Sequence, residues 1–341
     1  MQMRDDLGIT TKLENGKAYL EFALPEKIGR LLSALQIEIW EGAEGERLVF
    51  HGEYSSEEAD SMTALLLRPH LWDGMRDPYV YLVKAQGRFR TVEYGEKMGG
   101  MEKEEESDPA EDIPEAVEVH WRQELAIYDV RVVDKKGIFL NEKEFQPREV
   151  VYCFPPQISD AGTREEQMRR DLDRLARMGV NTIRLEGTGY GTEEQDRCEV
   201  RAFYNLCRGR GFLTGDRWIR PEILPVYRGL PGETTTEALL EADGRTLTER
   251  YYYYQAKWSN EPVLYPALST LHRQENGLLS LTIYSNQKKV VLYVDGVLFL
   301  FQSAASGDPE FIFEDIPVAK LPLHLAAEAG NLSISLTVSK I

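Results

Sequence analysis

The fold of this protein is decided by residues 163–185, which read TREEQMRRDLDRLARMGVNTIRL. Thr163 stands three residues before Glu166, so its hydroxyl and the carboxylate can satisfy two backbone donors at a helix start. One apolar stripe follows at helical spacing: Met168, Leu172, Leu175 and Ala176. Gly179 supplies the left-handed position that ends a helix, and 180–185 is a β-prone run. We therefore expect a helix that begins after Thr163 and leads into a strand.

The same pattern occurs once more on the C-terminal side. A second helix is expected with an apolar face made of Val200, Phe203, Leu206 and Cys207. Gly209 and Gly211 then lead into a short β-prone run, 212–216. Strands alternating with helices at this spacing predict parallel strands joined by right-handed crossovers. Residues 145–218 are therefore predicted to hold three parallel strands and two helices, the first steps of an α/β barrel.

The barrel pattern stops at this point. The next 32 residues, 219–250, contain one further β-prone run, 223–227. A complete barrel takes about 250 residues, and each strand-helix-strand unit about 30 or more. Five more units cannot fit, so we predict a truncated barrel remnant. Its open sheet needs cover from residues 219–250, from an adjoining sandwich or from a second protomer.

The regions on both sides of this remnant have β patterns. Residues 7–92 hold short alternating runs between turn residues, typical of an immunoglobulin-like β-sandwich of about seven strands. Asp295-Gly296 between two apolar runs predicts a type I′ hairpin, and 332–339 alternates strictly. The expected fold class is multidomain and mainly β. The predicted domains are an immunoglobulin-like β-sandwich (1–135), the truncated barrel remnant with its connector (136–250) and a C-terminal β-sandwich (251–341).

An acidic stretch, 93–118, interrupts the first sandwich. Eleven acidic residues face only Lys97 and Lys103 there, a net charge of −9 in 26 residues. Like charges repel one another, and the stretch has little apolar content to bury. We interpret it as a solvated loop inserted between the last two strands of the sandwich rather than as a linker or a metal site.

Composition excludes several classes of partner. The formal charge of the chain is −17, which argues against nucleic acid and anionic membranes as partners, because phosphate binding rests on clustered Lys and Arg. The three cysteines have no metal-ligand spacing, and their odd number argues against a disulfide framework. No long apolar run and no signal-like N-terminus occurs. We expect a cytoplasmic protein without membrane, metal or cofactor.

Six motifs in a fixed order carry a family resemblance. They are PHLWDG (69–74) with DPYVY (77–81), GIFLNEK (137–143) with REV (148–150), NTIR (181–184), FYNLC (203–207) with GFL (211–213), YYYQAKW (252–258), and YSN (284–286) with LYVDG (292–296). Together they resemble glycoside hydrolase family 2, which contains β-galactosidases and β-glucuronidases. The resemblance covers about residues 10 to 340, apart from the acidic stretch. It implies a sandwich, a catalytic barrel and a further sandwich.

The chain departs from this family at its catalytic residues. The resemblance implies two glutamates, an acid/base after an Asn on barrel strand 4 and a nucleophile on strand 7, and both would lie in 219–250. That segment has no Asn-Glu pair; its glutamates are Glu222, Glu233, Glu237, Glu241 and Glu249. The family's strand-end residues have also changed at Cys153, Glu186 and Arg217. We therefore expect no catalytic residues of the family type.

Replacement carboxylates are the alternative. Glu186 and Asp216 follow neighbouring predicted strands, about 4.8 Å apart, and retaining glycosidases hold their carboxyls about 5–5.5 Å apart. The competing interpretation is a salt bridge between Arg184 and Glu186 at a strand end. Trp258, with the tyrosines of 251–254, offers either a platform for a sugar ring or packing against a sandwich, and we favour packing. The predicted substrate-binding residues are Arg184, Glu186, Asp216 and Trp258.

The function expected from these features is a non-hydrolytic, carbohydrate-associated binding or scaffold protein, because the catalytic glutamates of the family are missing. The alternative is an active O-glycosyl hydrolase, similar to β-galactosidases, that uses Glu186 and Asp216 or is completed by a partner chain. The expected partners are a carbohydrate and either further copies of this chain or a full-length paralogue.

Overall fold

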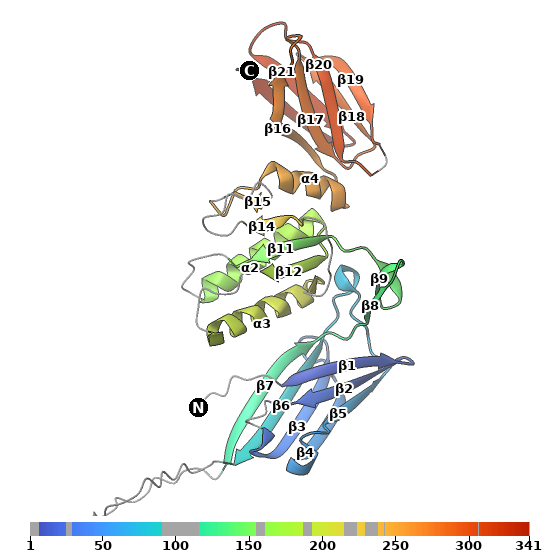
Figure 1. Ribbon diagram of the computed structural model, residues 1–341, viewed down its shortest axis with the longest axis vertical. Helices are drawn as coiled ribbons and strands as arrows, with labels where there is room; N and C mark the ends of the chain where they lie inside the picture. The colour runs from blue at the N-terminus through green and yellow to red at the C-terminus, as the bar shows by residue number, and fades with distance from the viewer. Residues whose placement is uncertain are drawn as a thin grey trace, which may run out of the picture. The chain divides into compact units, whose positions relative to one another are not determined.

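The computed structural model describes residues 7–24, 29–90, 116–154, 161–186, 193–214, 224–228, 238–241, 243–305 and 307–340 (Figure 1). The chain divides into two compact units, Met1–Phe145 and Gln146–Ile341. Strands dominate both units, and the described strands do not close into a barrel. The mainly β fold class predicted from the sequence is confirmed.

The first unit is built on two antiparallel sheets that pack face to face. One sheet has the order β1-β2-β5 and the other β4-β3-β6-β7. Their bounds are β1 Gly8–Glu14, β2 Lys17–Ala23, β3 Leu32–Glu41, β4 Arg47–Ser55, β5 Thr63–Leu67, β6 Tyr81–Arg90 and β7 Ala116–Leu125. Alternate residues face the shared core, such as Leu20 and Phe22 on β2 and Ile37 and Ile39 on β3. The alternation therefore buries one face of each sheet and leaves the other face in water.

The strands on either side of the acidic stretch are neighbours in the sheet. β6 and β7 pair in antiparallel register, from Tyr81 opposite Leu125 to Arg90 opposite Ala116. The stretch thus joins two adjacent strands of one sheet. Residues 91–115 lie outside the described residues.

Short elements complete the first unit. They are the 3₁₀ turns η1 (Ser56–Glu58) and η2 (Gly74–Arg76), and a small sheet of β8 (Val130–Val133), β9 (Gly137–Leu140) and β10 (Lys143–Phe145) in the order β10-β9-β8. The Asn141 side chain accepts a hydrogen bond from the backbone of Asp129 and donates one to the carbonyl of Trp72. Within the motif GIFLNEK, this asparagine therefore has a structural role.

The second unit begins with a parallel sheet of five strands in the order β13-β12-β11-β14-β15. Its strands are β11 Glu149–Cys153, β12 Thr182–Glu186, β13 Leu213–Thr214, β14 Val226–Arg228 and β15 Ala238–Leu240. The sequence predicted the first three strands, with β12 and β13 following β11 along one edge. The prediction that the sheet has only three strands is wrong, because β14 and β15 continue it from the other edge of β11. Strands from the segment 219–250 therefore pair on the edge of β11 that was expected to be open.

Three helices and the sheet share one core. They are α2 (Ala161–Met178), α3 (Glu193–Gly209) and α4 (Glu249–Trp258). The predicted stripe on α2 is buried, with Leu172 and Leu175 fully inaccessible, and so is Phe203 on α3. Gly179 has φ +91°, as expected for the residue that ends α2. The helix begins at Ala161, so the predicted start after Thr163 is wrong by three residues.

A second β-sandwich closes the unit. One sheet has the order β16-β17-β20 and the other β19-β18-β21-β22. The bounds are β16 Leu264–Arg273, β17 Leu279–Ser285, β18 Lys289–Val294, β19 Val297–Ser303, β20 Glu310–Ile316, β21 Leu323–Ala329 and β22 Leu332–Val338. Asp295 (φ 49°) and Gly296 (φ 81°) form the turn between β18 and β19, and these positive angles confirm the predicted type I′ hairpin.

None of the helices in the described parts of the chain is long and apolar enough to span a membrane.

Candidate functional site

Arg184, a predicted substrate-binding residue, forms an ion pair inside the parallel sheet. Its Nε donates a hydrogen bond to Oε1 of Glu149 at 3.0 Å. The register places Glu149 opposite Thr182 and Val151 opposite Arg184, so both charged residues lie on the same face of neighbouring strands. The Glu149 side chain is only 1% exposed. The guanidinium therefore compensates a buried charge within the protein. A salt bridge was expected for Arg184 with Glu186 at the strand end, whereas the structure pairs it with Glu149.

Glu186 is the last residue of β12, and it is exposed. Its register partner is Cys153, the last residue of β11, which is buried. Asp216, the proposed second carboxylate, lies outside the described residues. The replacement pair stays a prediction.

The carboxyl ends of the described strands form a row across the sheet. Glu186 lies opposite Cys153, and Arg228 lies opposite Leu240, with β11 and β14 paired between them. Glu241 directly follows β15. Glu186 and Glu241 therefore stand about three strand spacings apart, roughly 14 Å. Among the described residues, this row thus holds one carboxylate, Glu186, and Glu241 follows three strands away.

The aromatic run of α4 packs the helix against the C-terminal sandwich. Tyr252 stacks on Tyr265 of β16 with ring centroids 3.8 Å apart, and Tyr253 meets Tyr284 of β17 edge to face at 5.5 Å. Tyr251 is buried in the core under the parallel sheet. These contacts confirm the packing interpretation of the tyrosine run.

Trp258 lies at the end of α4. Its ring tilts against Tyr254 at 4.5 Å, and its backbone carbonyl accepts a hydrogen bond from Arg148 at 2.6 Å. The residue is partly buried against the core of the parallel sheet. Its contacts join the C-terminus of α4 to the start of β11, while a contact between its ring and a sugar stays a prediction.

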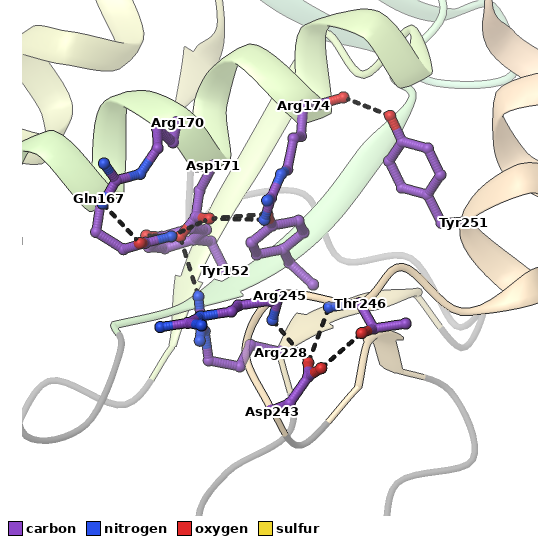
Figure 2. A network of polar contacts seen from close by, with 11 residues as sticks. Tyr152, Gln167, Arg170, Asp171, Arg174, Arg228, Asp243, Arg245, Thr246 and Tyr251 are labelled. Atoms are coloured by element: carbon purple, nitrogen blue, oxygen red, sulfur yellow. Dashed lines mark hydrogen bonds and ion pairs between the residues drawn. The ribbon is translucent and has the colours of Figure 1, made fainter.

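A buried polar cluster, which we call the Asp171 network, connects α2 to the sheet (Figure 2). Asp171 is 0% exposed, and its carboxylate accepts hydrogen bonds from four side chains. Tyr152 of β11 donates from 3.0 Å, Tyr227 of β14 from 2.8 Å and Gln167 of α2 from 2.8 Å. Arg228 of β14 adds a charged contact at 3.2 Å. Both carboxylate oxygens are thus satisfied by side chains from three elements.

Burial also fixes the protons of the two phenols. The pKa of Tyr152 is raised well above its usual value, first by burial and then by the adjacent Asp171 charge. The pKa of Tyr227 is raised for the same two reasons. Both hydroxyls therefore keep their protons at neutral pH and donate to Asp171. The network holds a charge in place; its groups are not set up to exchange protons with a substrate.

Asp171 could have been found from the sequence. It stands at the i+3 position from Met168 and directly before Leu172, on the apolar stripe of the helix. A carboxylate on a core-facing stripe requires buried partners. The identity of those partners could not be read from the sequence, since Tyr152 and Tyr227 lie 19 and 56 residues away.

A metal centre has no counterpart in the described parts of the chain. Among those residues, no three His, Cys, Asp or Glu side chains come together as metal ligands. Cys153 and Cys207 are both buried. Burial raises the pKa of the Cys207 thiol, so this cysteine is a poor nucleophile.

Comparison with known proteins finds relatives through structure only. No family model and no curated protein matches the sequence. An FMN-binding β-glucuronidase from Facaelibacterium prausnitzii L2-6 has a TM-score of 0.64 at 15% identity, over 98% of this chain and 73% of its own. A β-glucuronidase from Parabacteroides merdae has a TM-score of 0.62 at 11% identity, over 98% of this chain and 63% of its own. The chain has the fold of these glycosidases.

Two further solved structures extend the same comparison. A putative β-galactosidase from Bacteroides fragilis has a TM-score of 0.59 at 14% identity, over 97% of this chain and 72% of its own. A glycosyl hydrolase family 2 member from Bacteroides cellulosilyticus DSM 14838 has a TM-score of 0.60 at 11% identity, over 98% of this chain. The resemblance that the six motifs carry is therefore confirmed at the level of the fold, although the described strands form no closed barrel. This chain spans less than two thirds of the length of the Parabacteroides enzyme.

Proposed function

We propose that this protein is a non-hydrolytic member of the family 2 glycosidase fold that acts in carbohydrate binding or as a carbohydrate-associated scaffold. The fold is the starting point, because nearly the whole chain aligns with β-glucuronidases and a β-galactosidase. In α/β barrels the catalytic groups stand at the carboxyl ends of the strands. The catalytic groups of an active glycosidase would therefore stand in the row of strand ends of this sheet.

The observation that carries the proposal is the composition of that row. From β12 to β15 it reads Glu186, Cys153, Arg228 and Leu240, which includes one carboxylate. The next described carboxylate, Glu241, follows β15, three strands away from Glu186. The Arg228 guanidinium is directed to Asp171, and Arg184 to Glu149. These two guanidinium groups are thus committed to internal contacts, while Glu186 is exposed.

Residues 219–250 support the same conclusion. The glutamates that the family uses on barrel strands 4 and 7 would lie in this segment. The two strands described there are three residues long each, and β14 and β15 pair on the β11 edge. A segment of this length holds no room for the strand-helix units that would carry both glutamates.

Hydrolysis and binding assays test the proposal together. Purified protein is incubated with nitrophenyl β-D-galactoside and nitrophenyl β-D-glucuronide, and saccharide binding is measured by calorimetry with lactose and cellobiose. We expect no release of nitrophenol above a heat-inactivated control, together with measurable binding of a saccharide. Release of nitrophenol that the Glu186→Gln variant abolishes would establish the alternative, an active glycosidase that uses replacement carboxylates.

A scaffold role also requires that the protein associates with another chain. A tagged copy of the protein is expected to co-purify with untagged copies or with a full-length paralogue. Release of nitrophenol only in the presence of that paralogue would instead indicate a barrel completed by a partner chain.

A further inference from the structure

The first sandwich has a hollow on the outer face of its four-stranded sheet. Its volume is about 560 Å³, and it lies over the ends of β3, β4 and β6, the three neighbouring strands seen in Figure 1. The hollow arises from a small side chain. Ala34 faces outward on β3, where it is paired with Ser55 on one side and Arg88 on the other. We call this feature the sheet-face hollow.

Hydrogen-bonding side chains form the rim of the sheet-face hollow. In the row next to Ala34, Gln36 lies between Glu53 of β4 and Gln86 of β6. These three residues and Arg88 all line the hollow. The neighbouring Leu35 and Ile37 point into the core, so strand alternation fixes Gln36 outward. The rim is therefore held by a rigid sheet rather than by a loop.

Part of the rim is oriented by contacts outside the hollow. Glu118 of β7 accepts hydrogen bonds from Arg88 Nε at 3.0 Å and from Gln86 Nε2 at 3.3 Å. This leaves the terminal guanidinium nitrogens of Arg88 and the amide oxygen of Gln86 to face a ligand. The side chain of Gln36 makes no hydrogen bond to any residue within the described ranges. Donors and acceptors thus stand side by side on neighbouring strands.

Size and charge narrow the class of ligand. The volume falls within the range of about 300–1,000 Å³ that is typical of small-molecule sites. Glu53 and Glu58 line the hollow, and the one lining cation, Arg88, is already paired with Glu118. Phosphates and uronates would meet net negative charge here. Amide, carboxylate and guanidinium groups on adjacent strands suit the neighbouring hydroxyls of a neutral sugar.

We propose that the sheet-face hollow binds a neutral mono- or disaccharide through Gln36, Glu53, Gln86 and Arg88. This inference rests on the proposed carbohydrate-binding function and gives it a location away from the parallel sheet. The neutral preference also separates the site from a glucuronide site.

Calorimetry on the full chain tests this site with lactose, cellobiose and glucuronate as probes. Ala34→Tyr fills the hollow with a β-prone side chain, and Gln36→Ala removes one rim amide without adding bulk. The matched control is Thr10→Tyr, at an exposed outward position of β1 in the other sheet. We expect affinity for the neutral disaccharide to fall about tenfold or more in Ala34→Tyr and Gln36→Ala, and to stay within about twofold in Thr10→Tyr. Glucuronate should bind at least about tenfold more weakly than the neutral sugars.

The outcomes separate this inference from the proposed function. Saccharide binding that is equal in the wild type, Ala34→Tyr and Gln36→Ala would overturn the sheet-face hollow and leave the proposed function standing. Tighter binding of glucuronate than of lactose and cellobiose would overturn the neutral ligand class. The absence of binding to every saccharide would overturn the proposed function, and this site with it.

Discussion

The Asp171 network and the rim of the sheet-face hollow are both clusters of acidic, amide and basic side chains on regular elements, yet they differ in where their partners come from. Asp171 is fully buried, and its oxygens are satisfied by Tyr152, Tyr227 and Gln167. Gln36 stands on an exposed sheet face beside a hollow of about 560 Å³. A satisfied cluster stabilises the fold, while a cluster with open groups can bind a ligand.

Removing the buried carboxylate gives the largest effect that this comparison predicts. Asp171→Ala leaves Arg228 and two tyrosine hydroxyls buried without their acceptor, and should lower the free energy of unfolding by about 3–5 kcal/mol. Asp173→Ala is the control on the same helix, since Asp173 is 54% exposed and pairs with Arg210 at the surface. It should cost at most about 1 kcal/mol. Urea denaturation measures both, and equal losses would contradict the structural role of the network.

Two glycines show the same contrast, because one is enclosed by other backbone atoms and the other has free space around it. Gly179 and Gly277 both have positive φ, +91° and +83°. A Cβ on Gly179 would overlap the backbone of Trp258 and Ser259, whereas a Cβ on Gly277 would meet nothing within 4 Å. We expect Gly179→Ala to cost about 3 kcal/mol of unfolding free energy and Gly277→Ala about 1–2 kcal/mol. Similar losses, measured by urea denaturation, would show that the junction of α2 and α4 yields easily.

A substitution at the rim of the sheet-face hollow should have a small effect on stability. Gln36→Ala removes a side chain that has no hydrogen bond to the described residues, so unfolding free energy should change by about 0.5 kcal/mol or less. Thermal unfolding followed by circular dichroism measures this change. A loss of about 2 kcal/mol would mean that the rim of the hollow supports the sandwich, and the contrast with Asp171 would break down.

An exposed polar group can already be satisfied by hydrogen bonds within the protein, and Asp243 is an example. Hydrogen bonds from the Thr246 side chain, the Thr246 amide and the Arg245 amide lower the pKa of the Asp243 carboxyl from 3.8 to about 2. Because the folded pKa lies below the ordinary value, these bonds contribute stability above pH 3.8 that is lost as pH falls through about 2. The carboxyl carbon resonance of Asp243 should still report an ionised group at pH 3. A midpoint near the ordinary value would contradict the turn geometry, and Thr246→Val should raise the pKa.

Local patterns predicted much of this fold. The stripe of Met168, Leu172 and Leu175 predicted a buried helix face, and Gly179 predicted its end. Asp295-Gly296 predicted a hairpin turn with two positive φ angles. Each of these signals depends on residues within about two turns or four positions of one another. They succeed because side-chain periodicity and glycine conformation act over short distances.

Local patterns did not predict β15 or the partners of the buried charged residues. β15 (Ala238–Leu240) has three residues, too few to show a period of two, and it forms because β14 offers an edge for pairing. Glu149 and Arg184 are 35 residues apart, and Tyr227 and Asp171 are 56 apart. A charged residue on a core-facing stripe indicates that it has buried partners, but it does not indicate which residues they are.

The sequence by itself determined the order of the elements, the two β-sandwiches and the shortage of barrel strands, because these follow from local periodicity and from length. Only the tertiary structure decided that the sheet extends from both edges of β11, that Arg184 and Arg228 serve internal carboxylates, and that Ala34 opens a hollow beside Gln36. Strand pairing and burial join segments that are distant in the chain. Whether a polar side chain is satisfied or open to a ligand is therefore fixed only when those segments meet.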